Sequence, residues 1–168
     1  MSLRIVAESC IMKKYVWFLF PSLVLIVQCS HYDELQRNGN ESTAGSSESH
    51  HFGEDCMTCH HDNGSEAVRE GGWWNIAGSV YLPDQSGPMS DAKIELWSQP
   101  DREGQLYYTL EVDALGNFYT EKIVDFDGTC FPVVVDLTTG NYEDMHQAFH
   151  SGGCSSCHGK TEDVITVE

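Results

Sequence analysis

Two five-residue sequences carry the residue types best suited to chemistry. They are Cys56-Met57-Thr58-Cys59-His60 and Cys154-Ser155-Ser156-Cys157-His158, and both read Cys-x-x-Cys-His. Thiols three positions apart lie on one side of a short helical turn, where they can add to two vinyl groups, and the next histidine directs its imidazole at the iron. This spacing is the attachment signature of c-type haem. The sequence predicts two covalently bound haems c, attached through Cys56, Cys59, Cys154 and Cys157, with His60 and His158 as iron ligands.

Three other chemistries use paired cysteines at this spacing. A thioredoxin-like redox pair is disfavoured because each pair is followed by histidine and lies outside any βαβ pattern. A zinc site built from both pairs would satisfy tetrahedral thiolate geometry, and plain disulfides form in oxidising compartments. Zinc and disulfides both leave the two following histidines unexplained. Haem is therefore the preferred interpretation.

The elements that must position the two motifs are short strands between them. From Trp73 onward apolar residues alternate with period two, and four further apolar runs follow, separated by Pro-Asp, Gly-Asn and Asp-Gly turn pairs. Five short strands at close spacing predict a mainly β fold, a small antiparallel β-sandwich with partly helical or irregular haem-bearing flanks. The predicted strands are residues 74–81, 92–97, 106–112, 118–123 and 131–135.

The middle of the chain carries three sequence blocks typical of one kind of β-sandwich. They are Ala77-Gly78-Ser79-Val80-Tyr81, Ala92-Lys93-Ile94-Glu95-Leu96 and Val112-Asp113-Ala114-Leu115-Gly116-Asn117-Phe118. Through them, about residues 76 to 136 resemble the carboxypeptidase regulatory-like family of transthyretin-like sandwiches. That resemblance implies a structural or binding module without catalytic residues.

The flanks, about residues 48 to 64 and 140 to 160, resemble dihaem and multihaem c-type cytochromes through the two motifs. The order motif, sandwich, motif is also similar to small dihaem lipoproteins of respiratory bacteria that reduce extracellular acceptors. The resemblance implies that the sandwich is a rigid spacer for the haems. It also implies redox-protein partners, multihaem cytochromes among them. His50 begins a His-x-x-Gly-x-x-Cys lead-in that resembles segments before haem motifs in such lipoproteins, which implies His50 as the sixth ligand of the first iron.

The sixth ligand of the second iron is sought just before the second motif, where Met145, His146 and His150 lie. Eight residues separate His146 from Cys154, twice the span that His150 has for reaching around the porphyrin edge. His146 is therefore the preferred ligand. Met145 is the alternative, and its thioether would raise the reduction potential. We expect bis-histidine ligation at both irons.

The N-terminal region predicts export. Lys13 and Lys14 precede an apolar run over residues 15–27, which is typical of a secretion signal and too short for a transmembrane helix, and Met12 is an alternative start. The run ends at Cys29 in a sequence that resembles a bacterial lipobox, although Gln28 departs from the usual small residue. We expect lipidation of Cys29 and a place in the periplasm or at the outer membrane and cell surface. An ordinary signal peptide is the alternative.

Composition completes the predicted organisation. We expect residues 1–29 to form the signal and residues 30–49, which are rich in Ser, Asn and Gly, to form a flexible tether. The first haem-binding segment is then residues 50–72, the sandwich is residues 73–136, and the second haem-binding segment is residues 137–168. The 168 residues include 26 Asp and Glu against 9 Lys and Arg, a formal net charge of −17 at pH 7. This charge excludes a nucleic-acid-binding surface.

These features favour electron transfer over other functions. Eight histidines are enough to supply both a fifth and a sixth ligand to each of the two irons. No carboxylate pair lies in a motif that assigns acid and base roles, so we expect neither an enzyme nor a small organic substrate. The alternative is a haem-based sensor or small-ligand-binding module with one open iron site. A third hypothesis is a sandwich that binds a surface polymer.

Overall fold

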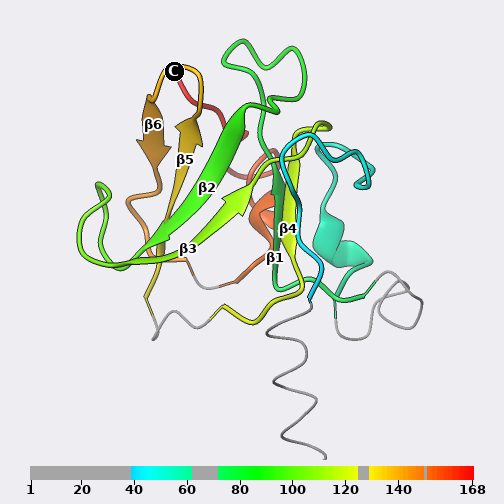
Figure 1. Cartoon of the computed structure of the whole chain (residues 1–168), viewed down its shortest axis with the longest axis horizontal. Coiled ribbons are helices and arrows are strands. Elements are labelled where there is room, and N and C mark those ends of the chain that lie inside the picture. The colour runs from blue at the N-terminus through cyan, green and yellow to red at the C-terminus, as the bar shows by residue number, and fades with distance from the viewer. Residues whose placement is uncertain (1–38, 62–71, 125–128, 150) are drawn as a thin grey trace, which may run out of the picture. The chain divides into compact units, whose positions relative to one another are not determined.

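The computed structural model describes residues 39–61, 72–124, 129–149 and 151–168. These residues form six strands and two short 3₁₀-helices, drawn in Figure 1. In chain order the elements are η1 (Cys56–Thr58), β1 (Ile76–Ser79), β2 (Ala92–Trp97), β3 (Leu106–Glu111), β4 (Asn117–Thr120), β5 (Phe131–Asp136), β6 (Tyr142–Asp144) and η2 (Cys154–Ser156). No helix in these described ranges is long and apolar enough to cross a membrane.

The strands form two antiparallel sheets, which confirms the predicted mainly β, antiparallel fold. One sheet pairs β1 with β4, and the other has the order β3-β2-β5-β6. Period-two alternation puts one set of side chains from each sheet into a shared core. We call this cluster the main core. Its largest fully buried members are Ile76, Val80, Leu96, Leu110, Val112 and Phe118.

Strand β1 departs from the predicted alternation because all four of its residues are buried. Residues on one side of β1 contribute to the main core, whereas Ala77 belongs to a separate small cluster with Trp74 and Tyr119. The partly buried Cys56 and Met57 pack against that small cluster. The second face of β1 is therefore covered by the first Cys-x-x-Cys-His segment rather than by solvent.

The flexible tether predicted over residues 30–49 is wrong for its second half. Glu41 forms an antiparallel bridge with Thr120, and Ser42 is 2% exposed and donates its backbone N–H to the Tyr119 carbonyl at 3.0 Å. The Ser42 hydroxyl also donates to the Glu111 carbonyl. This polar segment forms hydrogen bonds with the backbone groups at the edge of β4. Such pairing cannot be predicted from the amino-acid composition of the segment. Residues 30–38, like Cys29 and the predicted signal, lie outside the described residues.

Strand β6 is an element that the sequence pattern did not predict, and it extends the sheet beyond the expected boundary at residue 136. It pairs with β5 through Tyr142 opposite Val135 and Asp144 opposite Val133. The turn before it is held by Asp136, whose carboxylate accepts N–H groups from Thr138 and Thr139. A strand of three residues is too short to leave a periodic signal.

The outer face of β2 carries a buried carboxylate, Glu95, which is 3% exposed. It pairs with Lys93 at 2.8 Å and Arg102 at 2.9 Å, and it accepts the indole N–H of Trp97 at 2.9 Å. The Arg102 guanidinium also lies 5.0 Å from the ring centroid of Tyr142. This network joins β2, β6 and the loop after β2.

Glu95→Gln should destabilise the fold in a pH-dependent way. Burial raises the pKa of Glu95, but the bonds and charges of Lys93, Trp97 and Arg102 outweigh it and hold the pKa below the ordinary 4.5. A depressed folded pKa contributes stability that is present above the unfolded value and lost as pH falls through the folded one. We expect the variant to lose about 2 kcal/mol of unfolding free energy at neutral pH.

Denaturant unfolding at neutral pH and over a series of acid pH values that falls well below 4.5 measures this effect. The difference between parent and variant should shrink in acid, because the parent carboxylate becomes protonated there. Glu103→Gln, at an exposed position of the same loop as Arg102, is the matched control and should change little at either pH. A deficit of the same size at both pH values would show that shape rather than charge is responsible.

Candidate functional site

The two Cys-x-x-Cys-His sequences adopt the same backbone turn. In the first, the N–H groups of Cys59 and His60 both donate to the Cys56 carbonyl, at 3.2 and 3.0 Å. In the second, the N–H groups of the corresponding Cys157 and His158 donate to the Cys154 carbonyl at the same two distances. The repeated geometry brings two thiols and an imidazole to one short turn at each motif, as attachment of a porphyrin requires.

Both motif histidines are held in the orientation of a metal ligand. Nδ1 of His60 lies 3.2 Å from the Gly72 carbonyl, and Nδ1 of His158 lies 2.6 Å from the Asp163 carbonyl. A carbonyl can only accept, so each Nδ1 carries a proton, and in the neutral imidazole Nε2 keeps its lone pair for a metal. A carbonyl partner of this kind is the usual support for a metal-binding histidine. Nε2 of His60 is buried and has no hydrogen-bond partner among the described residues, as expected of a ligand atom.

An aromatic stack fixes the His60 ring. The ring centroids of His60 and Trp74 are 3.7 Å apart, with an interplanar angle of 5°. Trp74 stacks in turn on Tyr119, and their ring centroids are 4.3 Å apart. Trp74 and Tyr119 are positioning residues that sequence reasoning missed. Their only signal was that of strand residues, because aromatic side chains are common in any sheet.

The predicted sixth ligand of the first iron lies beside His60. The ring centroids of His50 and His60 are 5.7 Å apart. Two imidazoles on opposite sides of one metal, each with a bond of about 2 Å, have centroids about 6 Å apart. The structure therefore places the His50 ring beside the His60 ring, near that separation and at an interplanar angle of 41°.

The lead-in from His50 to Cys56 is anchored to the sandwich. The Asn117 amide donates to the His50 carbonyl at 3.3 Å, and the Gly53 N–H donates to the Ser79 hydroxyl at 3.0 Å. Gly53 has φ +79°, and a Cβ there would lie 2.1 Å from the Tyr81 hydroxyl oxygen. The positive φ thus favours glycine at this position of the His-x-x-Gly-x-x-Cys sequence, and a larger residue would also displace the Tyr81 hydroxyl.

The second motif opens onto a cavity of about 880 Å³. This volume lies within the range of about 300–1,000 Å³ found for cofactor and ligand sites. The apolar side chains that line it come from both sheets and from the segments around the motif. They include Ile94, Phe118, Val134, Phe149 and Ile165, and the motif residues Cys154, Cys157 and His158 border the same space. The size, the apolar walls and the donor set fit a porphyrin with its iron.

The two motifs meet at β1. Ala77 forms a parallel bridge with Gly153 and donates its N–H to the Gly152 carbonyl at 2.8 Å. Met57 of the first motif packs so closely on Gly153 that a Cβ there would lie 3.0 Å from the Met57 Cγ. An ion pair of 2.9 Å between Lys160 and Asp55 joins the two segments again. The motifs, almost a hundred residues apart in the chain, are neighbours in space.

The first cysteine of each motif packs in a different cluster beside β1, and Figure 1 shows η1 and η2 near this strand. Cys56 packs on the side of Ala77, in the small cluster, whereas Cys154 packs against the main core. A Cβ on Gly78, the next residue of β1, would lie 2.9 Å from the Cys154 Cβ. Successive strand residues face opposite sides, so Cys56 and Cys154 pack on opposite sides of β1.

The environment of two motif cysteines does not suit a redox pair. Burial raises the pKa of Cys154 to about 12 and that of Cys56 to about 11, whereas a thioredoxin-like pair uses a thiol of lowered pKa. All five cysteines in the described ranges are free. Cys130 is fully buried just before β5 and packs as a small apolar residue of the main core.

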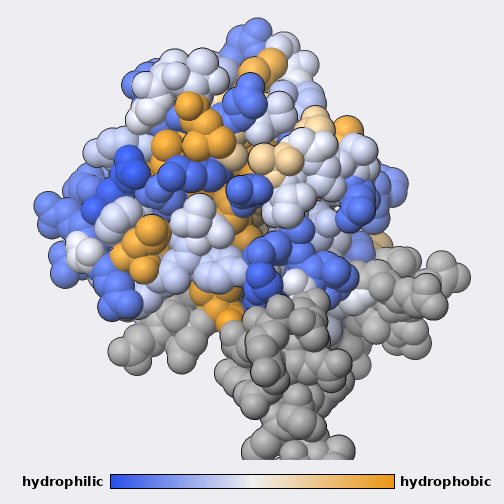
Figure 2. Space-filling view, viewed as in Figure 1, coloured by the Kyte–Doolittle hydropathy of each residue, from blue (hydrophilic) through white to orange (hydrophobic). Residues whose placement is uncertain are grey.

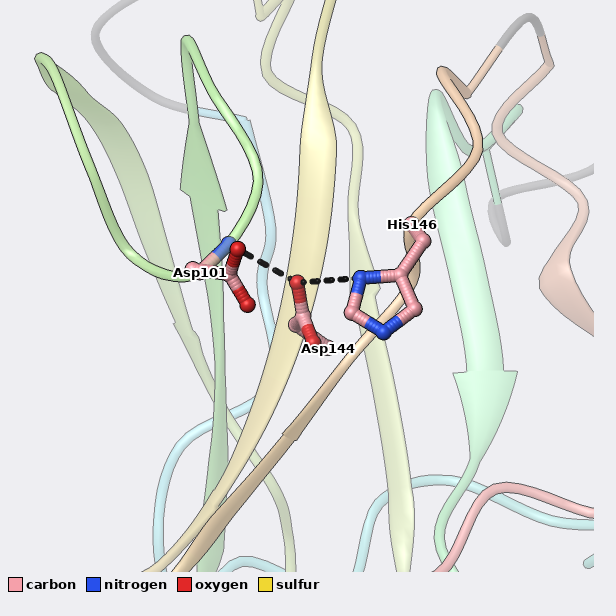
Figure 3. A group of neighbouring side chains, drawn as sticks. All are labelled: Asp101, Asp144 and His146. Atoms are coloured by element: carbon pink, nitrogen blue, oxygen red, sulfur yellow. Dashed lines mark hydrogen bonds and ion pairs between the residues drawn. The ribbon is translucent and has the colours of Figure 1, made fainter.

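Within the described residues, the four motif thiols do not form a group of possible metal ligands. Among the described residues, one group has three or more possible metal ligands with all their ligand atoms within 4.8 Å of one another. That group is Asp101, Asp144 and His146, and it includes none of the motif thiols (Figure 3).

The remaining predicted ligands lie before the second motif. Met145 and His146 both border the cavity, and His146 also pairs with Asp144 at 3.2 Å. His150 and Cys29 lie outside the described residues. No protein-family model, curated protein or solved structure matches the chain.

Proposed function

We propose that this protein is a dihaem c-type cytochrome that transfers electrons. The observation that carries the proposal is the repeated turn, in which each motif presents two thiols and a histidine with a free Nε2 lone pair. When bound, haem supplies an iron that cycles between ferric and ferrous states. The chain attaches it through Cys56, Cys59, Cys154 and Cys157, and His60 and His158 ligate the iron.

The neighbouring motifs support transfer between two haems. The Met57 contact with Gly153 and the ion pair between Asp55 and Lys160 hold the attachment segments against each other. Outer-sphere transfer needs no substrate on the metal, and the His50 ring beside His60 supports a closed first site.

Export and partner choice belong to the same proposal. The chain would be held at the membrane by lipid on Cys29, in the periplasm or at the cell surface, where haem attachment takes place. Its net charge of −17 favours redox partners with a basic docking surface. Multihaem cytochromes are the class of partner that the resemblance implies. Figure 2 shows a face dominated by hydrophilic side chains with small separate apolar patches, which suits brief, charge-steered encounters.

Haem content tests the proposal directly. Protein expressed with the haem-attachment machinery should bind two haems, each adding roughly 0.6 kDa to the polypeptide, as a pyridine haemochrome assay and mass spectrometry will show. A mass equal to the bare chain, or bound zinc in place of iron, would overturn it. Carbon monoxide should leave the spectrum of the reduced protein unchanged, whereas a shifted spectrum would support the sensor alternative.

A further inference from the structure

We infer that Met145, and not His146, is the sixth iron ligand at the second motif, so that the two haems have different ligand sets and different potentials. This inference rests on the proposed function. It differs from the bis-histidine ligation predicted from the number of residues between His146 and Cys154. Three observations carry it, namely the register of β6, the partner of His146 and the burial of the two side chains.

The register of β6 points Met145 into the cavity. Glu143 pairs with Val134, which belongs to the main core, so Glu143 lies on the inner side of the sheet. The ladder continues one residue past β6, because the Met145 N–H donates to the Pro132 carbonyl at 2.9 Å. Alternation then gives Met145 the same side as Glu143. Met145 is half-buried and lines the cavity that His158, Cys154 and Cys157 also border.

His146 belongs to the other side of the sheet edge. Its Nδ1 lies 3.2 Å from the Asp144 carboxylate, and the same Asp144 oxygen accepts the backbone N–H of Asp101 at 2.8 Å, as Figure 3 shows. Asp144 pairs with Val133, which alternates with the inward Val134. The His146 side chain is 74% exposed, so it stands at the rim of the cavity in contact with solvent.

The chemistry of the two side chains agrees with this placement. A thioether is uncharged and apolar, so it can lie among Phe118, Val134 and Ile165 without a hydrogen-bond partner. A methionine ligand raises the reduction potential of a haem iron relative to a second histidine. The first site, with His50 beside His60, should therefore be the lower-potential haem. Electrons would pass from the first haem to the second.

The test is made on the haem-loaded protein with Met145→Ala, Met145→His and His146→Ala. Oxidised parent protein should show the long-wavelength absorption band that marks methionine sulfur on ferric haem, and a redox titration should resolve two separate potentials. Met145→Ala should abolish the band, and Met145→His should abolish it and lower the upper potential only. His146→Ala should leave both the band and the two potentials unchanged. Met57→Leu and Met89→Leu are the controls and should keep the band.

A band that is missing from the parent, that survives Met145→Ala, or that disappears in Met57→Leu or Met89→Leu would overturn the inference. A carbon monoxide complex gained in His146→Ala would overturn it as well, because the histidine would then be the ligand. The number of covalent haems distinguishes a failure of the proposed function from a failure of the Met145 assignment. Protein without covalent haem refutes the proposed function, whereas two haems without a methionine band refute only the Met145 assignment.

Discussion

Replacing Cys154 and Cys157 with alanine should remove one haem and strongly destabilise the sandwich, whereas Cys56→Ala with Cys59→Ala should remove the other haem at much lower cost. The reason is where each motif packs. Cys154 lies against the main core, beside a cavity of about 880 Å³ that haem would fill. Cys56 lies against the small cluster, outside that core.

The expected difference is large. Loss of buried contacts with a residual cavity costs about 3–5 kcal/mol, whereas loss of the more peripheral contacts at the first motif should cost about 1 kcal/mol. Denaturant unfolding of both double variants, each with its haem count from mass spectrometry, measures the effect. Equal losses of unfolding free energy would contradict a core role for the second haem, and a variant that retains two haems would contradict the attachment sites themselves.

Local sequence patterns predicted the parts of this fold that depend on neighbouring residues. The run from Ala92 to Trp97 is a strand with the predicted bounds, because the alternation of apolar with charged residues acts within the strand itself. The Asp113 to Gly116 turn is equally local, since the Asp113 carboxylate accepts the N–H groups of Leu115 and Asn117. The motif turns are local too, which is why the candidate site could be read from spacing.

Contacts between distant segments could not be predicted in this way. The polar residues around Ser42 looked like a tether because their partner, the edge of β4, lies almost eighty residues further along. The choice between Met145 and His146 depends on which residues of β6 face the inner side of the sheet. This strand is too short to be predicted from the sequence pattern. Chain length alone favoured His146, whereas strand register favours Met145. The meeting of the two motifs at β1 belongs to the same class of long-range contact.

Gly152→Ala tests the contact between the second motif segment and β1 by adding a single Cβ atom. A Cβ at residue 152 would lie 1.5 Å from the Asn75 carbonyl oxygen and 3.0 Å from the Ile76 Cα. Both neighbours are backbone atoms of β1 or of the residue before it, so no side chain can rotate away. The segment must move off the strand, which breaks the 2.8 Å bond between the Ala77 N–H and the Gly152 carbonyl.

We expect Gly152→Ala to lose about 3 kcal/mol of unfolding free energy, at the upper end of the usual cost of overpacking, because backbone rather than side chain has to yield. The displaced segment carries Cys154 and His158, so the potential of one haem should shift and the contact of Gly153 with Met57 should be lost. Gly87→Ala is the matched control, since nothing lies within 4 Å of a Cβ there. Denaturant unfolding and redox titration of both variants make the comparison. If Gly152→Ala matched Gly87→Ala in unfolding free energy and in both potentials, the second motif would not be docked on β1, and the close approach of the two haem sites would have to be abandoned.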